Sequence, residues 1–119
     1  MLIKDMSFNF GLRIIALNRV LRELKEYELA SQVFRSGTSI GANVSEAEAA
    51  QTKPDFVTKM SIASKEARET LYWLRLMKAS EYFTINLDEE ERECESIVNI
   101  LTKIVKTTQE NIAKSKIKK

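Results

Sequence analysis

Three glutamates, Glu46, Glu66 and Glu69, are the side chains whose types and spacing could do chemistry, because predicted helices place them on facing surfaces. Bundles that hold two iron ions gather carboxylates in this way, but such sites also use a Glu-x-x-His motif on two helices. The chain contains no histidine, and carboxylates alone suit only hard, weakly held cations. We therefore expect no metal and no cofactor.

Nucleophilic catalysis has little support in the sequence. Without histidine, the chain lacks the commonest general base and the usual catalytic triads. Ser61, Ser64 and Lys65 could form a serine–lysine pair, but no strained turn or oxyanion donor accompanies them. Cys94 falls on an apolar helical seam, which favours a small buried residue over a nucleophile. We expect no catalytic residue and therefore a protein that is not an enzyme.

A structural role for the glutamates is a polar layer between two helices. Residues 35–50 read RSGTSIGANVSEAEAA. In this run a short polar side chain comes directly before each of several apolar residues that recur on one side of the predicted helix, so the polar residues form a neighbouring stripe. On the next predicted helix, Glu66 and Glu69 lie between large apolar neighbours. A carboxylate in such a place usually pairs with a cation or with small polar groups. The predicted layer comprises Arg35, Ser36, Ser39, Asn43, Glu46, Glu66 and Glu69, with Lys65 and Arg68 as further candidate cations.

The apolar seam beside this layer contains a glycine. It consists of Val33, Gly37, Ile40, Val44 and Ala47, which recur at steps of four and three residues. A partner helix can come close at such a seam, and we expect that partner to be the following helix, so that glycine, alanine and serine line the contact between the second and third helices. No apolar run approaches the ~20 residues that cross a bilayer, so the Gly37-x-x-x-Gly41 spacing indicates close packing in a soluble protein without a membrane partner.

Apolar periodicity and capping residues predict four helices, over about residues 7–25, 28–50, 54–79 and 87–114. Ser7 is the expected N-cap of the first, and Pro54 suits the first turn of the third, with Thr52 or Lys53 as its cap. Asn86 or Asp88 can cap the fourth. The inward residues of the remaining helices are expected to be Phe10, Ile14, Leu17, Leu21 and Leu24 in the first, Phe56, Met60, Ala63, Ala67, Thr70, Leu74 and Met77 in the third, and Cys94, Ile97, Leu101, Ile104 and Thr108 in the fourth.

Composition agrees with this helical interpretation. The chain has 119 residues, of which 44% are hydrophobic and 30% charged, with only three glycines and one proline. Such a composition argues against an all-β fold and against disorder. We expect one domain over residues 1–119, all-α, as an antiparallel up-down-up-down four-helix bundle. A single cysteine and no leader of the secretory type favour the cytoplasm.

Charge is nearly balanced overall but unevenly distributed. The net charge is +2, from 19 basic and 17 acidic residues, which by itself does not indicate a nucleic-acid partner. Acids crowd the start of the fourth helix and lysines its end, as the helix dipole favours. The candidate nucleic-acid contacts, which could equally form a solvated surface, are Arg13, Arg19, Arg22 and Lys25 on the first helix and Lys114, Lys116, Lys118 and Lys119 at the end of the chain.

Residues 28–77 closely resemble a known family. The motifs are RSGTSIGAN at 35–43, Asp55-Phe56, and KEARETLYWL at 65–74. Together they are similar to the four-helix-bundle proteins encoded in intervening sequences of bacterial 23S rRNA genes, the S23-type family. The resemblance implies a ring, typically a homopentamer with a central channel. It also implies a related fold in the accessory variability determinants of diversity-generating retroelements, which form pentamers and bind nucleic acid and a reverse transcriptase.

Two functional hypotheses follow. The first is a non-enzymatic homo-oligomeric assembly module whose basic helix faces meet RNA, DNA or a protein partner. The apolar positions on the first helix and the aromatic pair Tyr72 and Trp73 exceed what one small core needs, which makes that pair the candidate oligomer contact. The alternative is a protein adaptor that acts through its apolar faces and does not touch nucleic acid.

Overall fold

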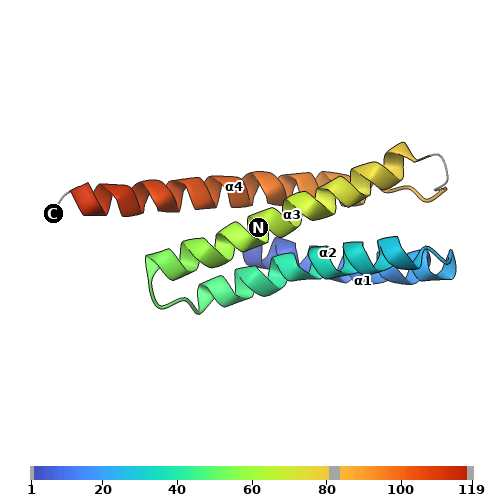
Figure 1. The fold of residues 1–119 in the computed structure, drawn as a ribbon, viewed down its shortest axis with the longest axis horizontal. Coiled ribbons are helices and arrows are strands. Elements are labelled where there is room, and N and C mark those ends of the chain that lie inside the picture. The colour runs from blue at the N-terminus through green and yellow to red at the C-terminus, as the bar shows by residue number, and fades with distance from the viewer. Residues whose placement is uncertain (1, 81–83, 118–119) are drawn as a thin grey trace.

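The computed structural model describes residues 2–80 and 84–117, and they form four α-helices. These are α1 (Ile3–Glu23), α2 (Tyr27–Glu48), α3 (Lys53–Ala79) and α4 (Asp88–Ile117), joined by short connections (Figure 1). The described part of the chain contains no strand. The prediction of an all-α fold with four helices is therefore confirmed.

Each helix packs against its neighbours in sequence, and α1 also contacts α4. In the described ranges the diagonal pairs, α1 with α3 and α2 with α4, make no comparable contact. The molecule is elongated, with extents of 57 × 25 × 24 Å. Figure 1 shows that α1 begins near the middle of the long axis, so that α2, α3 and the C-terminal half of α4 continue past its start.

One apolar stripe on each helix points into the core. The predicted stripes of α1, α2 and α3 are buried almost throughout, and in α4 burial extends from Cys94 to Leu101. Leu24 lies at the end of α1 and is 48% exposed, because the helix has already finished. At the start of α3, the Thr52 side chain accepts a hydrogen bond from the Asp55 amide at 3.1 Å, as predicted for a cap. The Asn86 side chain likewise accepts from the Asp88 amide at 2.9 Å at the start of α4.

The first helix starts earlier than the sequence signals predict, and Ser7 is not its cap. Ile3 and Met6 pack against the core and extend the apolar stripe by one turn. Ser7 lies within α1, buried, with its hydroxyl donating to the Lys4 carbonyl at 3.1 Å. The cap prediction was wrong because a serine inside a helix can satisfy its hydroxyl on the preceding turn.

The weakly marked turn between α1 and α2 has a defined geometry. Lys25 adopts a left-handed conformation with φ of 63°. Its amide donates to the Arg22 carbonyl at 3.0 Å, and the Glu26 amide donates to the Leu21 carbonyl at 2.9 Å. These two bonds form a Schellman motif, which normally places glycine at the left-handed position. A lysine in that position explains why no glycine marked the boundary in the sequence.

Gly37 of the seam and the neighbouring Gly41 face α1, which corrects the expectation that glycine lines the contact with α3. A Cβ atom on Gly37 would lie 2.8 Å from Cγ1 and 2.9 Å from Cγ2 of Ile14, and one on Gly41 would lie 3.3 Å from the Ser7 carbonyl oxygen. The missing side chains therefore let α2 approach α1 closely. Periodicity identified the buried stripe, but it did not show which of two neighbouring helices the glycines would meet.

We predict opposite effects for alanine at two glycines. Gly37→Ala should lower the free energy of unfolding by about 1–2 kcal/mol, because Ile14 is fully buried and its β-branched carbons cannot move aside easily. Gly11→Ala is the matched control, since nothing lies within 4 Å of its added Cβ, and it should raise stability by about 0.5–1 kcal/mol through helix propensity. Urea unfolding measures both, and equal stabilisation by the two changes would contradict the close packing.

Candidate functional site

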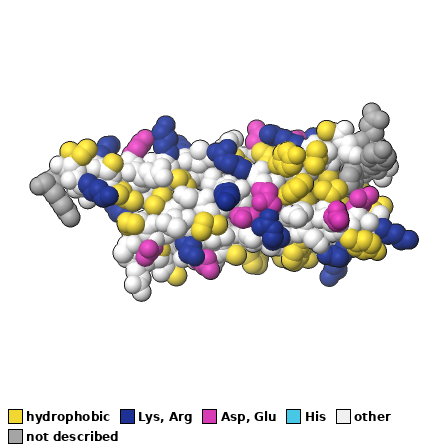
Figure 2. Space-filling model, in the orientation of Figure 1, with side chains coloured by type: hydrophobic (Ala, Val, Ile, Leu, Met, Phe, Trp, Pro, Cys, Tyr) yellow, Lys and Arg dark blue, Asp and Glu magenta, His cyan; other side chains and the backbone are white. Residues whose placement is uncertain are grey.

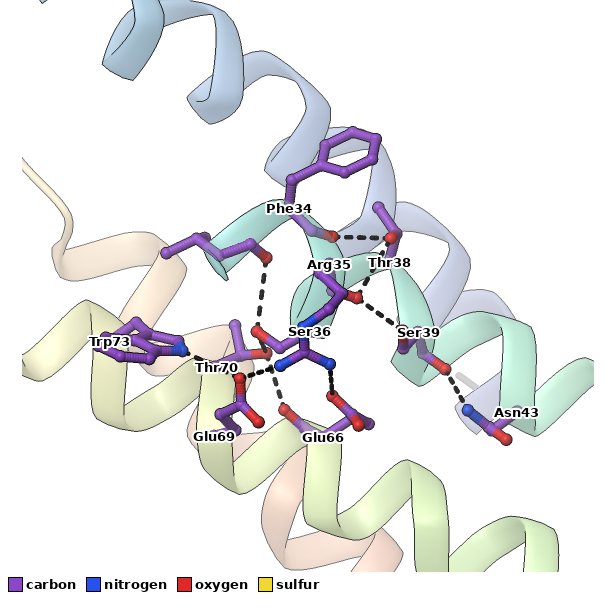
Figure 3. Close-up of polar contacts among 11 residues, drawn as sticks. Phe34, Arg35, Ser36, Thr38, Ser39, Asn43, Glu66, Glu69, Thr70 and Trp73 are labelled. Atoms are coloured by element: carbon purple, nitrogen blue, oxygen red, sulfur yellow. Dashed lines mark hydrogen bonds and ion pairs between the residues drawn. The ribbon is translucent and has the colours of Figure 1, made fainter. Parts of the chain in front are cut away.

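A cluster of charged side chains joins α2 to α3 at mid-length (Figure 3). The Arg35 guanidinium on α2 reaches across to α3, where it pairs with Glu66 at 3.3 Å and also with Glu69. The Trp73 indole Nε1 donates to Glu69 at 3.1 Å from the next turn of α3. One carboxylate thus accepts from an arginine on the other helix and from a tryptophan on its own.

Beneath this charged cluster lies a buried pair of hydroxyls. Ser36 of α2 and Thr70 of α3 are both fully buried, and their hydroxyl oxygens are hydrogen-bonded at 2.8 Å. Thr70 also donates to the Glu66 carbonyl at 2.8 Å. No buried side-chain nitrogen or oxygen in the described residues lacks a hydrogen-bond partner. The layer is therefore a satisfied structural contact.

The structure brings together four of the side chains expected in the layer and separates the other three. Ser39 and Asn43 turn back onto their own helix, donating to the Arg35 carbonyl at 2.6 Å and the Ser39 carbonyl at 2.9 Å. Glu46 forms its own pair with Lys59 at 3.1 Å, with both side chains well exposed. Thr70 and Trp73 join the layer although sequence reasoning had not placed them there.

Signals for both additions were present in the sequence. Thr70 occupies a core heptad position between apolar residues, where a hydroxyl needs a partner. Trp73 follows Glu69 by one helical turn, a spacing that brings side chains together.

The charged cluster lowers the pKa of the Glu69 carboxyl. Burial alone would raise it, but hydrogen bonds from Trp73 and Arg35, together with the positive charges of Arg35 and Lys65, outweigh that effect. Because the folded pKa lies below the ordinary value of 4.5, this contribution to stability is complete above that value. It is lost as the pH falls through the folded pKa.

A second set of ion pairs attaches the acidic start of α4 to its neighbours. Arg13 of α1 pairs with Glu93 at 3.1 Å, with Glu89 at 3.3 Å and with Glu90 at 3.8 Å. On α3, Arg75 contacts Glu91 and Glu95, and Lys78 contacts Asp88 and Glu91. The acids thus connect helices as well as lying at the positive end of the helix dipole.

These pairs determine which of the candidate basic residues are not already paired with a carboxylate. Arg13 is surrounded by three carboxylates, whereas Arg22 donates to Asn18 at 3.1 Å and to Ser31 at 3.5 Å. Arg19 is exposed and forms no ion pair within the described residues. Lys25, Lys114 and Lys116 are also exposed, and Lys118 and Lys119 lie outside the described residues.

Large apolar side chains remain exposed on two separate faces. The first, called the α1 face, comprises Phe8, Leu12 and Ile15 of α1 with Phe34 of α2, and Phe8 is 66% exposed. The second, called the α3 face, comprises the exposed Tyr72 and Leu76 of α3, together with the half-buried Trp73 of α3 and Leu29 of α2. Figure 2 shows hydrophobic side chains gathered over the C-terminal half of α3.

The α3 face is both aromatic and hollowed. Tyr72 is 58% exposed, and its ring packs edge-on against Trp73 with centroids 5.3 Å apart. Beside Trp73 lies an open depression of about 640 Å³, which Tyr27, Leu29 and Trp73 line together with the polar Glu28, Ser31 and Gln32. The predicted oligomer contact, Tyr72 and Trp73, therefore lies on the surface of the bundle.

The cysteine, a metal site and a membrane-spanning helix are the other features that the sequence analysis considered. Cys94 is buried, its thiol donates to the Ala67 carbonyl at 3.3 Å, and burial raises the pKa of the thiol to about 12. In the two described ranges, no group of acidic or thiol side chains is placed to hold a metal ion. None of the helices there combines the length and apolar character needed to cross a bilayer.

We predict that Glu69→Gln will lower the free energy of unfolding by about 1 kcal/mol at neutral pH, because charge-assisted hydrogen bonds are lost at a partly exposed site. The difference from the wild type should shrink as the pH falls from 4.5 through the lower folded pKa of Glu69, because below that pKa the carboxyl is protonated in the folded as well as the unfolded chain. Glu46→Gln, in the exposed pair with Lys59, is the matched control and should cost less than about 0.5 kcal/mol. Equal losses in urea unfolding at pH 7 would show that Glu69 has no special role.

Comparison with known proteins agrees with this architecture. The family model of the 23S rRNA-intervening sequence protein matches residues 1–105. A crystal structure of a protein with unknown function from the S23 ribosomal protein family of Bacteroides thetaiotaomicron is similar, with 43% sequence identity and a TM-score of 0.82. The alignment covers 88% of this chain and 99% of that one. No curated protein matches the chain significantly. The chain therefore belongs to the 23S rRNA-intervening sequence protein family.

Proposed function

We propose that the protein is a non-enzymatic assembly module, an antiparallel up-down-up-down bundle whose copies associate into a ring that presents basic surfaces to nucleic acid. The observation that carries the proposal is the presence of two unlike apolar faces on one small bundle. Large exposed apolar patches on soluble proteins mark interaction sites. The side chains of the α1 face take no part in the core, which the inward stripes fill, whereas Trp73 and Leu29 of the α3 face also pack partly against it.

Geometry supports contact between unlike faces. On α1, Phe8, Leu12 and Ile15 lie opposite the buried stripe, so no movement within the bundle can bury them. The α3 face lies on a different pair of helices, and its aromatic residues are the types enriched at interface centres. A contact between two different patches is heterologous. Such contacts form a closed ring when the rotation that relates one copy to the next returns to the first copy after a whole number of steps.

The resemblance to S23-type proteins implies five copies in the ring. A heterologous interface is compatible with that number, because each copy offers one α1 face and one α3 face. The exposed cations then supply the attraction for phosphate groups, which is additive over copies and weakens with salt.

We predict that the wild-type protein is an oligomer in native mass spectrometry. Leu12→Glu on the α1 face and Leu76→Glu on the α3 face should each shift the distribution to monomers, because a carboxylate would be buried in the interface. Ser96→Glu, on the exposed surface of α4, is the control and should leave the assembly intact. A wild-type protein that stays monomeric at high concentration would refute the proposal.

A protein adaptor is the alternative, and the depression beside Trp73 favours it, since concave sites that combine apolar and polar groups accept partner side chains. Trp73 is the only tryptophan, so its fluorescence reports directly on that site. An adaptor would bind its partner with little dependence on salt, whereas binding of nucleic acid would weaken steeply.

A further inference from the structure

We propose that the outer surface of α4, together with Arg68 of α3, is where the phosphate backbone of a nucleic acid binds. This inference rests on the proposed nucleic-acid function and moves its binding surface away from α1. Two observations support it: the cations of this surface are not in ion pairs with carboxylates of the described residues, and the surface carries no large apolar side chain.

One exposed stripe of α4 is entirely polar. Its residues recur at steps of three and four, all are exposed, and they are Arg92, Ser96, Asn99, Lys103, Lys106, Glu110 and Lys114. Side chains three and four positions apart are neighbours on a helix, so the stripe forms one continuous row. Four cations, a hydroxyl and an amide are the groups that most often contact phosphate oxygens.

Arg68 extends this row onto α3. Its guanidinium donates to the Thr102 hydroxyl at 2.7 Å, which holds it beside the residue that precedes Lys103. Lys65 lies one turn before Arg68 and is exposed as well, although its charge also acts on Glu69. Cations from two helices therefore meet at the same level of the bundle.

Acidic groups near the stripe are few, and most already have partners. Glu95 and Glu91 are paired with Arg75, and Asp88 is paired with Lys78 while also acting on Arg92. From Ser96 to the end of the chain, Glu110 is the only acid against six lysines. Figure 2 shows Lys and Arg side chains over the C-terminal half of α4. This half of the helix carries a net positive charge, and no ion pair between residues that the structure describes neutralises its lysines.

The basic residues of α1 are less suitable for this role. Arg13 is held by three carboxylates of α4. Arg19 follows Ile15 by one turn on the apolar side of α1, so an interface that covered Ile15 would also cover or crowd Arg19. The α4 stripe carries no large apolar side chain, and it would stay in contact with solvent in the assembly.

The test measures binding of a labelled single-stranded RNA of mixed sequence, and of a DNA duplex of the same sequence, by fluorescence anisotropy across a salt series. The double variant Lys103→Gln/Lys106→Gln should bind the RNA at least tenfold more weakly at about 0.1 M salt, and its log–log salt slope should fall by about 1.4, from two lost phosphate contacts. Its oligomer mass should be unchanged. Arg19→Gln/Arg22→Gln is the comparison variant for the α1 surface; measured at conditions where its oligomer mass equals that of the wild type, it should bind nearly as well as the wild type.

The outcomes separate this inference from the proposed function. Wild-type binding that the α1 variant weakens and the α4 variant does not would overturn the α4 surface while leaving nucleic-acid binding in place. Equal losses in both variants would also contradict a surface centred on α4. Failure of the wild type to bind either probe at low salt would remove nucleic-acid binding itself.

Discussion

The arrangement of this protein depends on one constraint: α1 is apolar on two opposite sides, and a helix in a solitary bundle can bury only one of them. Phe10, Ile14 and Leu17 fill the inner side, where the absence of a side chain at Gly37 lets α2 come close. Phe8, Leu12 and Ile15 are then directed outward. Because burying apolar surface is the dominant favourable term in association, we propose that another copy of the chain covers the outer side. On this proposal, the aromatic α3 face is the different surface that the copy meets.

Several charged side chains of the bundle form ion pairs between helices. Arg35 ties α2 to α3 through Glu66 and Glu69, and Arg13 ties α1 to the start of α4. Pairs at such partly exposed sites stabilise modestly, but several of them fix which helix faces which. The charges that are not paired are unevenly distributed. The acids near the start of α4 are in ion pairs, whereas the described cations along its outer surface are not. The near-zero net charge of the sequence hides this separation.

Much of the fold could be predicted from the sequence, because apolar periodicity determines which side of each helix is buried. The stripes of α1, α2 and α3, and the Thr52 cap, follow from local rules of this kind. Relations between helices could not be obtained in the same way. A stripe that contains Gly37 lies between two neighbours, and only the packed structure shows that Ile14 fills the space. The partners of Arg13 lie on a helix distant in sequence, and Ser39 and Asn43 had backbone carbonyls of their own helix available as competing acceptors.

Cross-linking between copies tests the central claim most directly. Cys94 is buried, so a cysteine placed at Leu12 and one placed at Leu76 would be the reactive thiols in their respective variants. With a short bismaleimide, a mixture of Leu12→Cys and Leu76→Cys proteins should give linked pairs that contain one of each variant, whereas each variant alone should stay largely unlinked. Efficient linking within Leu12→Cys alone would indicate a symmetric contact between like faces, and no linking in the mixture would indicate that the two faces do not meet. Either result would contradict the account.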